Sequence, residues 1–176
     1  MVFATGDKAR STSEAVVDTD PDFFASIIAS YQQQSNIARR IVPKRKAAYE
    51  KALGHPMSSI LEIGCGAGAY ATAYEEVGVT YRAIEIDADI AKHARENTHA
   101  DIEVGDFMTI DDDRTYDVIF ASQVFEHIAT PHKFLKKTMS ALTPNGILHL
   151  DVPNHGSLTS QVRKLVGKRD FGFIQP

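Results

Sequence analysis

The sequence predicts an α/β fold built on a doubly wound, mostly parallel sheet, and three observations indicate it. A short apolar run at residues 59–63 ends in alternating glycines and precedes a helix-compatible segment at residues 70–77. A strand, a tight turn and a helix in this order open a βαβ unit. Strand-like and helix-like segments then alternate up to residue 152, which favours a parallel sheet with helices on both faces. With 176 residues, 43% of them hydrophobic, the chain fits one domain with a sizeable core.

The chain before this unit predicts a tail followed by two helices. Residues 1–19 lack sustained periodicity, so we expect a loosely ordered tail. Residues 20–57 are predicted to be helical and to cover the site as a lid or to pack on the sheet. The first helix begins at Asp20 and Pro21, a cap residue followed by proline. Its apolar face repeats at helical spacing through Phe23, Phe24, Ile27, Ile28 and Tyr31. The second helix runs from near Pro43 to Leu53 and stops at Gly54.

After the glycines, the pattern predicts the rest of the sheet. We expect strands at residues 80–85, 102–104, 116–121 and 147–152, with helices at 87–96 and 131–142. Asp87 suits the N-cap of the first of these helices. Ligands of such sheets bind at the carboxyl ends of the strands near the switch point. The first strand is that switch point.

The glycines at positions 64, 66 and 68 predict a ligand site. A turn without Cβ atoms lets backbone N–H groups approach a nucleotide-like ligand beside the positive end of a helix dipole. The spacing Gly64-x-Gly66-x-x-Ala69 also fits a dinucleotide fingerprint. Glu62 favours a different ligand, because a carboxylate two residues before the first glycine repels a phosphate and suits a cationic amino group. S-adenosylmethionine carries such a group and no phosphate. We interpret Cys65 as a buried filler of the turn.

Acidic residues also end the next two strands. Glu85 lies 21 residues after Gly64, a spacing at which a carboxylate accepts both hydroxyls of a ribose. Asp106 follows the third strand, where it can accept a hydrogen bond from an adenine amino group while Phe107 packs beside the ring. The ordered series of acidic strand ends favours a nucleoside-containing ligand.

At this point the run from Ile60 to Ala69 resembles motif I of the class I S-adenosylmethionine-dependent methyltransferases. Residues 116–128 and 142–154 resemble the fourth strand with its loop, and the fifth strand, of the branch that includes ubiquinone-biosynthesis O-methyltransferases. Asn145 stands where that branch commonly has glycine, and asparagine tolerates the positive φ of the turn. The resemblance covers residues 58–155 and implies a Rossmann-like fold with strand order 3-2-1-4-5.

The resemblance implies S-adenosylmethionine as the methyl donor and S-adenosylhomocysteine as the product. Together with the arguments above, it gives one set of cofactor-binding residues: Glu62, Gly64, Cys65, Gly66, Gly68, Glu85, Ile86, Asp106, Phe107, Ser122 and Gln123. Because the donor already carries an activated methyl group, the protein must mainly position a nucleophile and accept a proton. We therefore expect a methyltransferase acting on a small-molecule acceptor, at oxygen, with nitrogen and carbon left open.

His127 is the candidate general base, because imidazole titrates near neutral pH, and Glu126 is the candidate to orient it. The pattern Glu-x-x-Glu-His holds a divalent ion in small-RNA 3′-terminal methyltransferases. Here Gln123 occupies its first position, and His149 and His155 are the only downstream histidines able to help. Hard cations prefer several carboxylates, so no metal is expected.

Charge and composition restrict the partners. A formal net charge of −4 offers no general affinity for nucleic acid. We interpret two basic clusters as solvated faces: Arg39, Arg40, Lys44, Arg45 and Lys46, and Arg163, Lys164, Lys168 and Arg169. A single cysteine cannot form an internal disulfide, and neither a signal peptide nor a membrane span is evident. The sequence therefore predicts a cytoplasmic protein.

Residues 156–176 are too few for the two further strands of such methyltransferases. We therefore expect a truncated or naturally short form, in which a homodimer can cover the open edge of the fifth strand. Two alternatives stay open. One is a non-catalytic S-adenosylmethionine-binding or scaffolding module. The other, which Glu62 disfavours, is an NAD(P)-dependent oxidoreductase.

Overall fold

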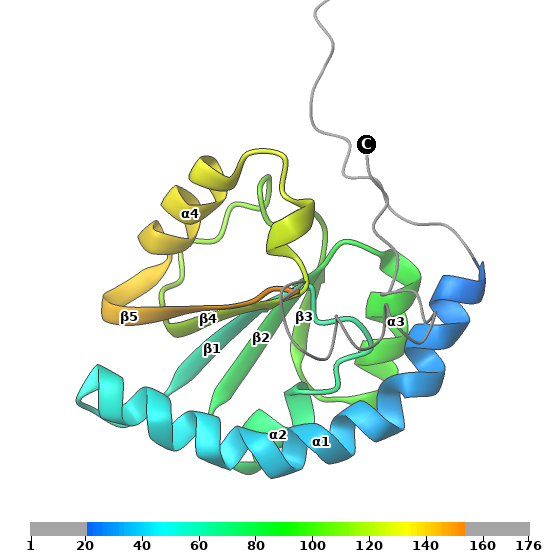
Figure 1. The fold of residues 1–176 in the computed structure, drawn as a ribbon, viewed down its shortest axis with the longest axis horizontal. Helices are drawn as coiled ribbons and strands as arrows, with labels where there is room; N and C mark the ends of the chain where they lie inside the picture. Colours follow the sequence, from blue (N-terminus) through cyan, green and yellow to red (C-terminus); the bar gives the residue numbers. More distant parts are fainter. Residues whose placement is uncertain (1–20, 154–176) are drawn as a thin grey trace, which may run out of the picture.

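The computed structural model describes residues 21–153 and shows a five-stranded sheet (Figure 1). The strand order is β3-β2-β1-β4-β5, with every neighbouring pair parallel. This confirms the predicted α/β fold and strand order. The strands are β1 (Ser59–Ile63), β2 (Thr80–Glu85), β3 (Asp101–Val104), β4 (Tyr116–Ser122) and β5 (Leu142–Asp151). In register, Ile63 pairs with Ile84 and Ala121, and Ser122 pairs with Asp151. The carboxyl ends of the strands therefore meet at one edge of the sheet.

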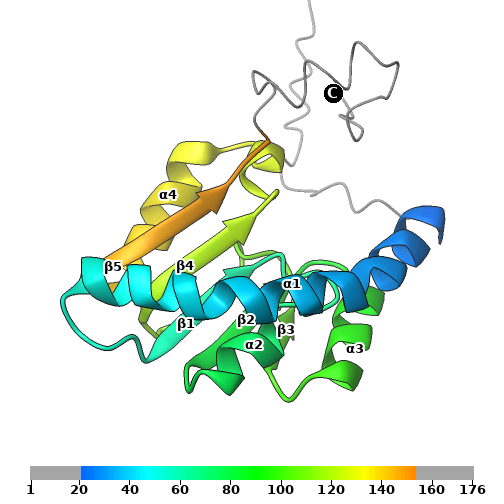
Figure 2. The same ribbon diagram turned by 60° about the horizontal axis from the view of Figure 1, so that its bottom comes forward.

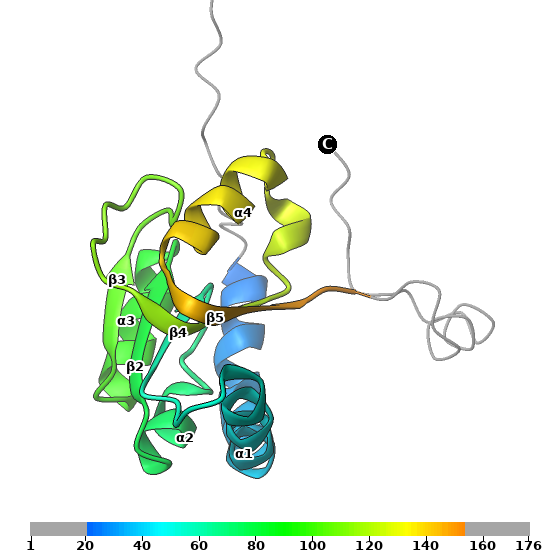
Figure 3. The same cartoon turned by 90° about the vertical axis from the view of Figure 1, so that its left-hand side faces the viewer.

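Helices cover both faces of the sheet. α1 (Pro21–Leu53), α2 (Ala71–Glu76) and α3 (Ala88–Asn97) lie on one side, and α4 (Pro131–Ser140) lies on the other (Figures 1 and 3). The short helix η1 (Phe125–His127) joins β4 to α4. Side chains alternate between the faces along each strand. Ile60 and Phe120 therefore pack with the helices of the α1 face, whereas Leu61 and Ile63 pack on the α4 face.

The prediction of two N-terminal helices is wrong, because α1 is one helix of 33 residues that contains Pro43 (Figure 2). Proline lacks the N–H that an interior helical position uses. Here Pro43 is exposed, and the buried face continues on both sides of it. That face consists of Ser35, Ala38, Val42, Tyr49 and Leu53. Burial of this face outweighs the local preference of proline to end the helix.

Other element boundaries differ little from those predicted, except for β5. Asp87 caps α3 as predicted, and its carboxylate accepts hydrogen bonds from the N–H groups of Asp89 and Ile90. β5 begins at Leu142, so the turn expected around Asn145 lies within the strand. An irregularity in the pairing of β4 with β5 accommodates it, and Asn145 adopts a φ of 66°. Residues 1–19, residues 154–176 and the side chains of the predicted Phe and Ile face of α1 lie outside the described part.

Among residues 21–153, no helix combines the length and hydropathy needed to cross a bilayer.

Candidate functional site: the carboxyl edge of the sheet

The glycine turn follows β1 directly and is fixed by backbone hydrogen bonds. The N–H of Gly64 donates to the carbonyl of Ile84 at 2.8 Å, and the N–H of Gly68 donates to the carbonyl of Cys65 at 3.0 Å. Gly64 has a φ of 73°, and a Cβ there would lie 2.5 Å from Cγ2 of Val124. Glycine is therefore required at position 64 by both its conformation and the contact with the loop after β4.

Gly66 and Glu85 form the open part of this turn. A Cβ on Gly66 would meet nothing within 4 Å. The Gly66 N–H donates to Oε2 of Glu85 at 2.8 Å, and the Asp87 N–H donates to Oε1 at 3.1 Å. Glu85 is only 6% exposed, and burial raises the pKa of its carboxyl group. The carboxylate is thus fixed below an open turn, with acceptor positions left on both oxygens.

Glu62 lies beneath the turn rather than in it. Its side chain points to the α1 face, is 2% exposed, and accepts a hydrogen bond from the Tyr81 hydroxyl at 2.5 Å. Burial raises the pKa of Glu62 to about 8. The carboxyl group of Glu62 is thus enclosed and hydrogen-bonded within the protein.

The other predicted cofactor-binding residues near the turn, β2 and β3 differ in their exposure. Cys65 is buried, as expected for a filler, and burial raises the pKa of its thiol. Ile86 is exposed at the end of β2. Asp106 Oδ1 accepts a hydrogen bond from the N–H of Met108 at 2.8 Å, which closes the turn after β3. Phe107 is turned into the α4-face core, with its ring centroid 5.4 Å from that of Phe134.

The loop after β4 brings Ser122, Gln123 and η1 to the same edge. Gln123 has a φ of 57°, and its N–H donates to the carbonyl of Asp151 at 2.8 Å. His127 is exposed, and Oε2 of Glu126 is buried with no hydrogen-bond partner among the described residues. Within residues 21–153, no hydrogen bond joins these two side chains, so the predicted orienting role of Glu126 gains no support from this geometry.

A cluster of four side chains near this edge was missed by the sequence reasoning. We call Arg45, Tyr49, His149 and Asp151 the α1–β5 cluster. Tyr49 Oη and His149 Nδ1 form a hydrogen bond, His149 Nε2 lies 3.0 Å from Oδ1 of Asp151, and Arg45 Nη2 donates to Oδ2 of Asp151 at 3.0 Å.

The guanidinium of Arg45 also lies over two aromatic rings. Its carbon is 4.8 Å from the centroid of Phe120 and 5.4 Å from that of Tyr70, which follows the glycine turn. The interpretation of the first basic cluster as a solvated face is therefore wrong for Arg45, although Arg39, Arg40 and Lys44 are exposed. The only sequence signal for the α1–β5 cluster was the spacing of its members. Arg45 and Tyr49 are four residues apart on a helix, and His149 and Asp151 are two residues apart on a strand, so each pair lies on one face.

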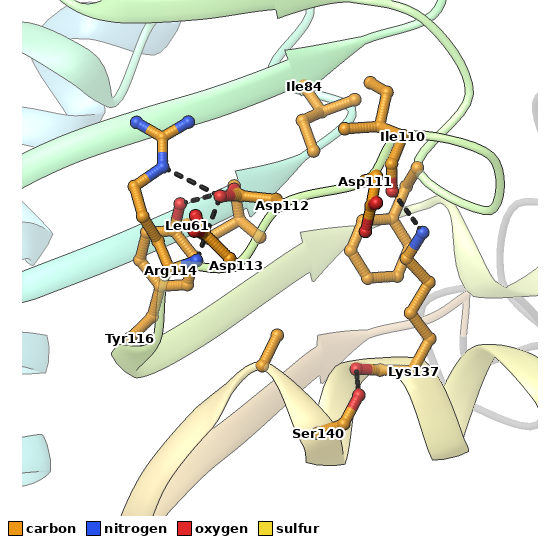
Figure 4. Close-up of a pocket in the computed structure, with 12 residues that line it drawn as sticks. Leu61, Ile84, Ile110, Asp111, Asp112, Asp113, Arg114, Tyr116, Lys137 and Ser140 are labelled. Carbon is orange, nitrogen blue, oxygen red and sulfur yellow. Dashed lines mark hydrogen bonds and ion pairs between the residues drawn. The ribbon is translucent and has the colours of Figure 1, made fainter.

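A cavity of about 210 Å³ lies away from the glycine turn, on the α4 face (Figure 4). Leu61, Ile84 and Phe107 line it together with the loop before β4. In that loop Asp112 accepts hydrogen bonds from Arg114 and Tyr116, and Lys137 of α4 donates to the carbonyl of Ile110. None of the predicted site residues except Phe107 lines this cavity, so we place the candidate site at the carboxyl edge instead.

Comparisons with known proteins show the family and the fold. The family model described as a methyltransferase domain matches residues 31–172. The chain is 28% identical over 106 residues to the ubiquinone biosynthesis O-methyltransferase of Glaesserella parasuis serovar 5 (strain SH0165), covering 54% of this chain and 45% of that relative. It is 24% identical over 130 residues to the malonyl-[acyl-carrier protein] O-methyltransferase of Calditerrivibrio nitroreducens (strain DSM 19672 / NBRC 101217 / Yu37-1), covering 74% and 52%. The chain thus spans about half the length of the curated relatives it matches.

Solved structures share the fold. The plantazolicin methyltransferase BpumL in complex with SAH superposes with a TM-score of 0.68 at 21% identity, covering 81% of this chain and 57% of that one. Streptomyces venezuelae DesVI superposes with a TM-score of 0.62 at 17% identity, covering 78% and 59%. Since the family model matches most of the chain, the protein belongs to the class I S-adenosylmethionine-dependent methyltransferases.

Proposed function

We propose that this chain binds S-adenosylmethionine at the glycine turn and transfers its methyl group to a small-molecule acceptor, at oxygen. The observation that carries the proposal is the Glu85 carboxylate, held by the N–H groups of Gly66 and Asp87 below an open turn. A fixed carboxylate at the end of β2 suits the two hydroxyls of a ribose.

The charges near the turn favour this cofactor over a dinucleotide. Glu62 and Glu85 are both buried next to the turn, and any negative charge on them disfavours a pyrophosphate above it. The same negative charge attracts a sulfonium compound with an amino group. This argument supports S-adenosylmethionine and disfavours the oxidoreductase alternative.

The other predicted contacts follow from the same placement. Ile86 is exposed next to Glu85 and offers an apolar surface to a base, while Ser122 and Gln123 border the opposite side of the turn at the end of β4. We propose Asp106 as an acceptor for the adenine amino group, through the oxygen not used by Met108. The ring of Phe107 is buried in the α4-face core, next to Asp106 in the sequence, and we propose that it supports the turn after β3.

Bound S-adenosylmethionine supplies an activated methyl group, so the chain must align the acceptor and take up its proton. His127 is the sequence-derived candidate for the base, and its exposed side chain on η1 lies beyond the end of β4. Oxygen is the proposed acceptor atom because the two curated relatives are named as O-methyltransferases. An unchanged methylation rate in His127→Ala would remove this assignment.

Calorimetric titration with S-adenosylhomocysteine and, separately, with NAD tests the cofactor. We expect micromolar binding of the first and none of the second. Glu85→Ala should abolish binding, whereas Glu96→Ala, a matched change of an exposed glutamate on α3, should leave it unchanged. Binding of NAD alone would refute the proposal. Binding of S-adenosylhomocysteine by a chain that methylates no acceptor would favour the non-catalytic module.

β5 is one of the two edge strands of the described sheet, and we propose that a second copy pairs with its edge. Light scattering after size-exclusion chromatography tests this homodimer, since a monomer at all concentrations contradicts it.

A further inference from the structure

The donor and the acceptor of each hydrogen bond in the α1–β5 cluster can be assigned from the chemistry of its members. An ionised aspartate only accepts hydrogen bonds, so the bond between Asp151 and Nε2 of His149 requires a proton on Nε2. In the neutral imidazole, Nδ1 then accepts from the hydroxyl of Tyr49. Burial raises the pKa of Tyr49 to about 12, which keeps this hydroxyl protonated. The cluster therefore fixes His149 as the Nε2–H tautomer.

Within residues 21–153, Asp151 is the member of the cluster whose remaining hydrogen-bonding capacity is exposed, because the unpartnered Nη1 of Arg45 is buried. Each of its oxygens accepts one hydrogen bond, from His149 or from Arg45, although each can accept two. Both nitrogens of His149 are engaged, and Tyr49 is buried. The Asp151 side chain is 36% exposed. A ligand at the carboxyl edge can thus reach this carboxylate.

The position of Asp151 places it beside the proposed methyl-transfer site. It pairs in register with Ser122, and its carbonyl accepts from the N–H of Gln123. On the other side, Arg45 connects it to Tyr70 at the end of the glycine turn. β5 lies two strands from β1, which corresponds to about 10 Å. An acceptor lying between the turn and η1 therefore borders Asp151.

We propose that Asp151, in place of the sequence-derived candidate His127, takes the proton from the acceptor, that the acceptor nucleophile is a hydroxyl or an amine, and that His149 and Tyr49 position the carboxylate. This inference rests on the proposed methyltransferase function. As a lone pair of the acceptor bonds to the methyl carbon, the carbon–sulfur bond breaks, its electron pair stays on sulfur, and the acceptor proton passes to Asp151. A carboxylate suffices as the base, because the proton becomes strongly acidic as the new bond forms.

A carboxylate acceptor would behave differently, and this gives the proposal its sharpest test. An ionised carboxylate has no proton to lose, and the charge of Asp151 repels it. Replacement of Asp151 should therefore impair methylation of hydroxyl and amine acceptors and leave carboxylate acceptors unaffected or improved.

Asp151 could also serve only as a structural link between α1 and β5. A measurement that needs no acceptor distinguishes this role from the proposed positioning of its carboxylate by His149 and Tyr49. Nitrogen-15 NMR spectra of the histidines, with His149 assigned through His149→Gln, report the tautomer. We expect the Nε2–H form in the wild type, with a loss of this preference in Asp151→Asn and in Tyr49→Phe. A dominant Nδ1–H form in the wild type would overturn the positioning role.

Further charged and titratable groups surround the other members of the cluster, and these belong in the interpretation of the spectra. Tyr70, which follows the glycine turn, and Tyr74 of α2 act electrostatically on Arg45, and Glu62 of β1 acts on Tyr49. Spectra of Glu62→Gln therefore serve as a control, because the tautomer of His149 should persist in that variant.

The activity test uses catechol, glucosamine and malonyl-pantetheine as hydroxyl, amine and carboxylate probes, with the release of S-adenosylhomocysteine as the readout. Asp151→Asn should lower turnover of the hydroxyl or amine probe at least about 100-fold. Asp89→Asn, an exposed aspartate on α3, should leave turnover unchanged.

Titration of the same samples with S-adenosylhomocysteine separates the two proposals. Failure of the wild type to bind it refutes the proposed function itself. If binding is intact, three outcomes overturn the inference: turnover of Asp151→Asn within threefold of the wild type, a parallel loss of cofactor affinity in this variant, or methylation of the carboxylate probe alone. Loss of turnover in His127→Ala with normal turnover in Asp151→Asn would return the role of base to His127.

Discussion

Replacement of Glu62 by glutamine should make the stability of this protein much less dependent on pH. Glutamine has nearly the same shape as glutamate, and its amide oxygen can still accept the hydrogen bond from Tyr81. It cannot ionise. The substitution therefore removes the titration of one buried carboxyl group and leaves the packing of the α1 face intact.

The expected magnitude follows from the pKa of Glu62, which burial raises from the usual 4.5 to about 8. Below pH 4.5 the carboxyl group is neutral in both the folded and the unfolded chain, and its full stabilising contribution is present. As the pH rises towards 8, only the unfolded chain releases the proton, and the folded state loses about 1.4 kcal/mol per pH unit. Over this window the wild type should lose about 5 kcal/mol that Glu62→Gln retains.

Urea denaturation at pH 5, 6, 7 and 8 measures this difference, provided that unfolding is two-state. The variant should gain stability relative to the wild type at each step up in pH. Glu75→Gln on α2, a partly exposed glutamate, controls for the loss of one negative charge and should track the wild type. A stability difference between Glu62→Gln and the wild type that stays constant across this range would refute the reasoning.

Three further substitutions test the packing around the site by urea denaturation. Gly64→Ala should lower the free energy of unfolding by about 3 kcal/mol, because it adds a Cβ 2.5 Å from Val124 at a positive φ. Gly54→Ala, also at positive φ but in open space, should lower it by only about 1 kcal/mol. Equal losses in the two variants would contradict the steric argument. Phe134→Ala, which empties a fully buried position beside Phe107, should cost about 3–5 kcal/mol, and a loss below 1 kcal/mol would show that the α4 face collapses into the space. Asp87→Ala should cost about 1 kcal/mol through loss of the α3 cap, with Asn at this position restoring most of it.

The parts of the structure that the sequence predicted correctly have local causes. The glycine turn, the alternation of strands and helices and the Asp87 cap each depend on residues within a few positions of one another. Pro43 shows the limit of local reasoning, because burial of a long helical face kept α1 continuous across it.

The site was predictable only where it follows the strand ends. Glu85 has its expected place, since the end of a parallel strand next to a glycine turn fixes it. The α1–β5 cluster joins Arg45 to Asp151 across 106 positions and Tyr49 to His149 across 100. Contacts at such separations leave no local pattern. The burial of Phe107 against Phe134 likewise depends on the position of α4, which the residues around Phe107 do not encode.

The continuity of α1 has a mechanical consequence. One helix contacts α3 through Tyr31 and His93, α2 through Arg39 and Glu76, and β5 through Arg45 and Asp151. Pro43 lies between the last two contacts. It lacks the N–H that would bond to the carbonyl of Arg39, so α1 resists bending least at this position. A single missing backbone hydrogen bond at Pro43 thus divides α1 into a part that contacts α2 and α3 and a part that carries Arg45 and Tyr49 against β5.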